Sequence, residues 1–120
     1  PLLAAELDLG ALLARVPSKF DVESVKSYPP VLEDLAILIE DEIPARRVEE
    51  VIRQAGGDLL VEVRLFDLYR GDQIGKGLKS LAYSLVYQAG DRTLTDDEVA
   101  KVRSKILARL ERELGAKLRA

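Results

Sequence analysis

The stretch LLVEVRLFDLY, residues 59–69, decides the fold because its pattern of apolar residues changes phase halfway along. From 61 to 65 the odd-numbered residues are apolar and alternate with charged ones, which predicts a half-buried strand; from 66 onward the even-numbered residues are apolar. A β-bulge at Leu65 or Phe66 would keep every apolar side chain on the core face. The same bulge would turn Asp67 and Tyr69 outward.

Two more strands are predicted on either side of this stretch. Residues 31–39 are almost continuously apolar, as in a central strand, and their odd-numbered side chains from 35 to 39 share one face. Residues 79–88 alternate strictly, so one set of side chains faces the core and the other faces away. The core set is Leu81, Tyr83, Leu85 and Tyr87, and the outward set is Ser80, Ala82 and Ser84.

Helices are predicted after the first and third strands. Pro44 is suited to the first position of an amphipathic helix. Thr95 and Glu98 form a capping-box pattern at the start of a longer helix that Gly115 would close, and residues 116–119 fit a short last strand. The order β-α-β-β-α-β predicts an α+β, ferredoxin-like fold, in which two helices cover one face of a four-stranded antiparallel sheet.

The other sheet face is expected to stay open, and its composition is suited to single-stranded nucleic acid. A row of small side chains, an outward tyrosine and flanking cations can receive unstacked bases. The residues expected on this face are Asp34, Ala36, Glu62, Arg64, Asp67, Tyr69, Ser80, Ala82, Ser84, Lys117 and Arg119.

Composition narrows the classes of function. The chain has 120 residues and no Cys or His, which excludes Cys nucleophiles, Ser-His-Asp triads and thiolate or imidazole metal sites. A net charge of −3 argues against nonspecific polyanion binding, so any nucleic-acid site must be local. No apolar run is long enough to span a bilayer, so we expect no membrane partner, and the absence of Cys is compatible with the cytoplasm.

The first 26 residues are expected to be a segment and linker from a preceding module, leaving residues 27–120 as the domain. The segment has too few apolar positions to fold alone, and Pro17 would stop a short helical run over 11–15. The chain begins with Pro1 and contains no Met, which suggests a piece of a larger protein.

Five motifs occur in an order that is typical of one family: YPP (28–30), DLA (34–36), LFDLYRG (65–71), KSLAY (79–83) and RTLTDDE (92–98). Together they resemble the ferredoxin-fold anticodon-binding domain that ends the beta subunit of bacterial phenylalanyl-tRNA synthetases. The resemblance implies a parent ligase, an alpha2-beta2 tetramer that joins phenylalanine to tRNA(Phe) using ATP and magnesium. It places the active site in the alpha subunit, so we expect neither a catalytic site nor a cofactor in this chain.

The resemblance also implies roles for individual residues toward the anticodon loop. By motif, Tyr69 is a stacking platform for the first anticodon base, Asp67 accepts from a base edge and Ser80 is a hydrogen-bonding group beside them. Candidate cations are Arg64 and Lys117 on the open face and Lys79 at its rim, where it would touch the RNA backbone. The family commonly has Arg before the Asp of the first strand; Glu33 stands there instead, which puts a contact from that position in question.

Each of these signals also has a purely structural reading. Tyr69 could fill the edge of the core, Asp67 could stabilise the turn at Arg70-Gly71, and Ser80 could simply be solvated. The alternative function is a ferredoxin-like module that binds a small effector or assembles with other copies. That alternative requires an apolar, ligand-sized pocket or a self-complementary face.

Overall fold

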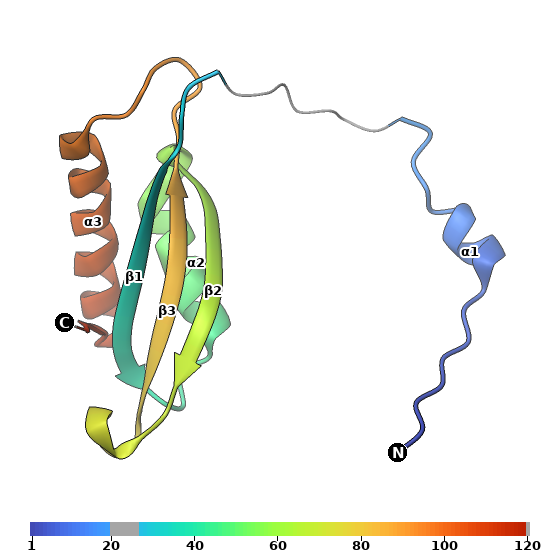
Figure 1. Ribbon diagram of the computed structural model, residues 1–120, viewed down its shortest axis with the longest axis horizontal. Helices are drawn as coiled ribbons and strands as arrows, with labels where there is room; N and C mark the ends of the chain where they lie inside the picture. Colours follow the sequence, from blue (N-terminus) through green and yellow to red (C-terminus); the bar gives the residue numbers. More distant parts are fainter. Residues whose placement is uncertain (20–26, 120) are drawn as a thin grey trace.

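A four-stranded antiparallel sheet backed by two helices forms the domain, in a computed structural model that describes residues 1–19 and 27–119. The sheet order is β2-β3-β1-β4, and Figure 1 shows α2 behind the sheet and α3 beside β1. This arrangement confirms the predicted ferredoxin-like fold. In chain order the elements are β1 (Val31–Glu40), α2 (Ala45–Gly56), β2 (Leu60–Tyr69), β3 (Leu78–Tyr87), α3 (Asp96–Leu114) and β4 (Lys117–Leu118).

The core lies between the sheet and the helices. The apolar side chains expected there are buried: odd-numbered residues of β1 and β3 pack against Val48, Val51 and Ile52 of α2 and against Val99, Ile106 and Leu110 of α3. Each large aliphatic side chain removed from water contributes about 1.5–3 kcal/mol. Tyr83 and Tyr87 are core residues, as predicted, and burial raises the pKa of both phenols.

The bulge predicted in β2 is present. The register between β2 and β3 shifts between Leu65 and Asp67, so Phe66 has no partner, whereas Asp67 lies opposite Ala82 and Tyr69 opposite Ser80. One part of the prediction is wrong, because the bulge does not bury every apolar residue. Phe66 is 53% exposed and Leu68 is 41% exposed. Since β2 is the outer strand of the sheet, its last residues lie at the margin of the core.

Two element boundaries differ from the expected ones. Pro44 is the N-cap of α2, with extended backbone, rather than its first helical residue. The last strand, β4, is two residues long instead of four, yet the amide of Arg119 still donates to the carbonyl of Ala36 at 2.9 Å. Arg119 is therefore placed in line with the sheet although it lies beyond the strand.

The N-terminal stretch contains one short helix, α1 (Leu9–Leu13), two residues earlier than the helical run expected over 11–15. Asp8 caps it by accepting a hydrogen bond from the amide of Ala11 at 3.0 Å. Its leucines are exposed, and Figure 1 shows this stretch well away from the sheet. The end of the expected linker, residues 20–26, lies outside the described residues. None of the described helices is both long and apolar enough to cross a membrane.

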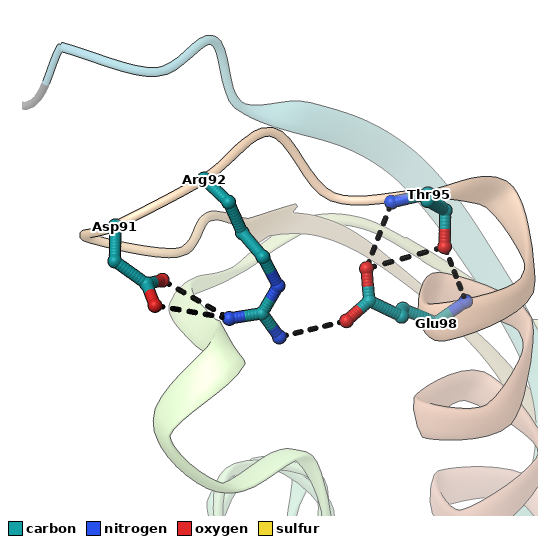
Figure 2. A network of polar contacts seen from close by, with 4 residues as sticks. All are labelled: Asp91, Arg92, Thr95 and Glu98. Carbon is teal, nitrogen blue, oxygen red and sulfur yellow. Dashed lines mark hydrogen bonds and ion pairs between the residues drawn. The ribbon is translucent and has the colours of Figure 1, made fainter.

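A capping box starts α3, as predicted (Figure 2). The amide of Thr95 donates to the Glu98 carboxylate at 3.0 Å, and the amide of Glu98 donates to the Thr95 hydroxyl at 3.3 Å. Arg92 also donates to Glu98, at 2.7 Å. The hydrogen bond from Thr95, followed by that from Arg92, lowers the pKa of Glu98 to about 2. Asp96, Asp97 and Glu98 thus complement the helix dipole.

The lowered pKa of Glu98 predicts a pH-dependent contribution to stability. A carboxylate with a lower pKa in the folded state stabilises the fold above its unfolded pKa, and this stabilisation is lost as pH falls through the folded pKa. We expect Glu98→Gln to have a lower melting temperature than the parent at pH 6. The difference should narrow between about pH 4.5 and pH 2, measured by circular dichroism. A matched control is Glu111→Gln on the same helix; a pH-independent difference for Glu98→Gln would contradict the assignment.

Candidate nucleic-acid interface

One face of the sheet is free of helices, and we call it the open face. Strand pairing places side chains on this face in rows, because directly paired residues point to the same side. Its members are Leu32, Asp34, Ala36 and Leu38 of β1; Glu62, Arg64, Asp67 and Tyr69 of β2; Ser80, Ala82, Ser84 and Val86 of β3; Lys117 of β4; and Arg119.

Two adjacent rows bring the predicted site residues together. One row runs Tyr69, Ser80, Leu38, Lys117, and the next runs Asp67, Ala82, Ala36. Rows on one face are separated by two residues of strand, about 7 Å. The small side chains of the second row leave a shallow floor beside the tyrosine. A flat group lying against Tyr69 can therefore reach the Asp67 carboxylate.

Arg119 lies over the ring of Tyr69, with its guanidinium carbon 5.6 Å from the ring centroid. This distance is within the range of a cation–π interaction. The Nη1 atom of Arg119 also donates a hydrogen bond to the hydroxyl of Ser80 at 3.1 Å. Residue parity predicts Arg119 on this face, but no sequence motif predicts a role for it. The available signal was the parity shared by residues 117 and 119, which could not reveal that the guanidinium would reach Tyr69.

Ser80 is not a solvated surface residue. Only 3% of it is exposed, because its neighbours in the row and Arg119 cover it. Its hydroxyl accepts the hydrogen bond from Arg119 and retains a proton to donate. Ser80 is thus part of a small polar group with Arg119, next to the tyrosine ring.

Several charged residues of the open face form no hydrogen bond or ion pair within the part of the chain that the structure describes. Within residues 1–19 and 27–119, the Asp67 carboxylate makes no hydrogen bond or ion pair, and the turn after β2 is tied by Arg70 and Asp41 at 2.7 Å. The turn-stabilising role considered for Asp67 is therefore filled by Asp41. In the same described part, Arg64 and Lys117 form no ion pair. These three charges are available to a ligand.

Lys79 does not lie at the rim of the open face, so that expectation is wrong. It pairs with Ile39 on the helix-covered side and is 5% exposed. Its ammonium donates to the carbonyl of Asp41 at 2.7 Å. The alternation of β3 already assigns residue 79 to the core face, the same parity as Leu81. A buried lysine is tolerated here because the carbonyl and the nearby carboxylate of Asp41 compensate its charge.

Glu33 also points away from the open face. It pairs with Leu85, on the helix side of the sheet, and forms an ion pair with Arg103 of α3. In this fold, position 33 therefore contributes to the contact between sheet and helix rather than to the open face. Its neighbour Tyr87 is buried close to the Glu33 carboxylate, which adds to the rise in the pKa of the phenol.

The buried hydrogen bond of Lys79 predicts a role in stability. We expect Lys79→Met, which keeps the aliphatic stem, to lower the free energy of unfolding by about 2 kcal/mol because the Asp41 carbonyl loses a charged donor. Urea denaturation of the chain measures this change. Lys76→Met in the exposed turn before β3 is the control, and equal stability of the two variants would show that the buried ammonium contributes nothing.

The family model and the relatives that match this chain agree on one family. Residues 26–119 match the family model of the ferredoxin-fold anticodon binding domain. The phenylalanine–tRNA ligase beta subunit of Moorella thermoacetica is 49% identical over 119 residues, which cover 97% of this chain and 14% of that protein. The beta subunit of Clostridium tetani is 45% identical over 115 residues, covering 96% and 14%, and that of Bacillus subtilis is 42% identical over 114, covering 95% and 14%.

The chain thus spans about one seventh of the length of these relatives. The family match covers all six elements of the sheet and helix layers, together with the rows that contain Asp67, Tyr69 and Ser80. It favours the nucleic-acid reading over an effector-binding or assembly module. By its sequence match and its fold, the chain belongs to the ferredoxin-fold anticodon binding domain family.

Proposed function

We propose that the open face binds the anticodon loop of tRNA(Phe), with one base stacked on Tyr69. The observation that carries this proposal is the placement of Tyr69 and Asp67 on neighbouring rows of an uncovered sheet face. An aromatic platform with a polar group one row away can take the π-face and the edge of the same base. Family membership supports the choice of an anticodon as the RNA element.

Each polar residue has a distinct role in this arrangement. The Asp67 carboxylate repels phosphate, so it fits only as an acceptor for a base amine or imine. The buried Ser80 hydroxyl accepts from Arg119 and would hold its guanidinium beside the same base. Arg64 and Lys117, on opposite sides of β3, are available to phosphates of the loop. The edge of the base would then point toward Asp67, and the phosphates of the RNA backbone would lie near Arg64 and Lys117.

The expected affinity of this site is modest. One base stacked on an aromatic residue contributes about 1–3 kcal/mol, which does not give tight binding alone. On the open face, the acidic residues Asp34, Glu62 and Asp67 offset Arg64, Lys117 and Arg119. We therefore expect recognition to depend on local contacts and on further tRNA contacts elsewhere in the parent protein, which raise the effective concentration of the loop.

For the parent protein, we propose a phenylalanine–tRNA ligase in which this chain is part of the beta subunit and its partner is the alpha subunit of an alpha2-beta2 tetramer. The names of the relatives support this assignment. Residues 1–26 would be the end and linker of the preceding module. Aminoacylation uses ATP and magnesium and takes place in the cytoplasm, where bacterial tRNA is charged.

The residues described here do not form a site suited to magnesium. Across residues 1–19 and 27–119, no three His, Cys, Asp or Glu side chains are grouped as metal ligands. In the acidic run at the start of α3, Glu98 is engaged in the capping box, and Asp96 and Asp97 lie in the first turn of the helix. We therefore assign this chain a role in tRNA recognition.

Stacking on Tyr69 predicts a loss of affinity when the ring is removed. We expect Tyr69→Ala to weaken binding of an anticodon stem-loop of tRNA(Phe) roughly 5- to 150-fold, as loss of one stacked base implies. Fluorescence anisotropy with labelled RNA measures the change. Tyr28→Ala is the matched control, because Tyr28 is 37% exposed and precedes β1 at the opposite end of the sheet.

In the full ligase, the same Tyr69→Ala variant should lower aminoacylation of tRNA while leaving activation of phenylalanine by ATP unchanged. Equal losses in both steps would indicate misfolding. Unchanged stem-loop affinity in Tyr69→Ala, with the fold intact, would reject the stacking model. Chemical-shift changes confined to the helices on adding RNA would reject the open face as the interface.

Phosphate contacts by Arg64 and Lys117 predict a dependence on salt. For single-stranded RNA, the logarithm of affinity falls with the logarithm of salt concentration by about 0.7 for each phosphate contact. We expect Arg64→Ala and Lys117→Ala each to make this slope shallower by about 0.7. Lys101→Ala, on the helix side, should leave the slope unchanged. If both open-face variants have the same salt slope as the parent, Arg64 and Lys117 do not contact phosphates of the RNA.

A further inference from the structure

The ring of Tyr69 lies against the backbone of Gly71. A Cβ atom built on Gly71 would be 2.3 Å from the phenol oxygen and 2.7 Å from Cζ of Tyr69. Carbon atoms in favourable contact are about 3.5–4.0 Å apart, so no other amino acid fits beside the ring in its present orientation. Gly71 has extended backbone, with φ 179° and ψ 164°, which any residue adopts. The missing side chain, rather than backbone conformation, is the feature that matters here.

We infer that Gly71 is a positioning residue for the base-binding tyrosine: its bare backbone sets the orientation in which Tyr69 presents its ring on the open face. The inference rests on the proposed function, because it concerns the same stacking platform. It assigns the glycine of the turn after β2 a role in RNA recognition that operates entirely through Tyr69.

The backbone around Gly71 is held by contacts on both sides, whereas the far end of the Tyr69 side chain can rotate. Immediately before it, Arg70 forms an ion pair with Asp41 at 2.7 Å. The carbonyl of Gly71 itself accepts a hydrogen bond from the amide of Ile74 at 3.2 Å. Farther along the turn, the carbonyl of Gly77 accepts from the amide of Asp41 at 2.9 Å. A methyl group at residue 71 would therefore displace the tyrosine ring, which is the more mobile partner.

A second neighbour makes the ring orientation matter for binding. Arg119 lies over the ring at 5.6 Å and is itself held by Ser80 and by the carbonyl of Ala36. Moving the ring away from Gly71 therefore changes its contact with Arg119 and its alignment with Asp67 on the next row. Both changes reduce the overlap available to a base, although the core and the sheet remain as they are.

The test compares Gly71→Ala with Gly90→Ala in the 120-residue chain. Gly90 is the matched control because a Cβ there would meet nothing within 4 Å. NMR of the free proteins reports the orientation of the ring directly, because the ring current of Tyr69 shifts the resonances of the Arg119 side-chain protons that lie over it. We expect Gly71→Ala to shift the Arg119 and Tyr69 resonances and to leave the unfolding midpoint near the parent value. Gly90→Ala should leave those resonances in place.

Binding of the tRNA(Phe) anticodon stem-loop gives the second readout. We expect Gly71→Ala to weaken it about fivefold, near the lower end for one stacked base, and Gly90→Ala to leave it unchanged. In the Tyr69→Ala background, adding Gly71→Ala should cause no further loss. A full additional loss in the double variant would overturn the inference, because Gly71 would then act independently of the ring.

One further result bears on the proposal even if Gly71→Ala fails to fold. In the parent chain, a nuclear Overhauser effect between the Gly71 α protons and the Tyr69 ring is expected, and its absence would overturn the inference. Unchanged Arg119 and Tyr69 resonances in folded Gly71→Ala would overturn it as well. Failure of the proposed function looks different: Tyr69→Ala would bind RNA like the parent, while the resonance shifts in Gly71→Ala would still support the positioning role.

Discussion

The pairing of β2 with β3 controls the functional surface, since the second of its two register shifts determines which side chains at the end of β2 face solvent. Phe66 has no partner in β3, and the register resumes one residue later with Asp67 opposite Ala82. Without that extra residue, the side chains after it would exchange faces, placing Leu68 on the open face and Tyr69 under the helices. A local irregularity on the outer strand thus creates the platform, and the core behind it is unaffected.

Polar contacts around Asp41 hold the end of this surface in place. Its carboxylate pairs with Arg70, its carbonyl accepts from the buried Lys79, and its amide donates to Gly77. These contacts join the turn between β1 and α2 to the turn between β2 and β3. Tyr69 is the last residue of β2, so its position depends on them. The residues around the platform thus contribute as much to its geometry as the platform residues do.

The open face has nearly balanced charge, which suits a specific rather than a general RNA interface. A strongly basic surface would bind phosphates of any nucleic acid. Here the exposed carboxylate of Asp67 lies beside the aromatic ring, where it favours a base edge and disfavours phosphate. This arrangement is consistent with a family named for anticodon binding.

Local sequence patterns alone determined the order of elements, the capping box at Thr95, the core parity of β3 and the bulge that turns Tyr69 outward, because these follow from neighbouring residues. The tertiary structure decided the rest. The buried Lys79 ammonium is stabilised because the Asp41 carbonyl, 38 residues away, accepts a hydrogen bond from it, and Phe66 is exposed because β2 lies at the sheet edge. The Tyr69–Arg119 contact likewise depends on segments that meet only after folding, which no local pattern encodes.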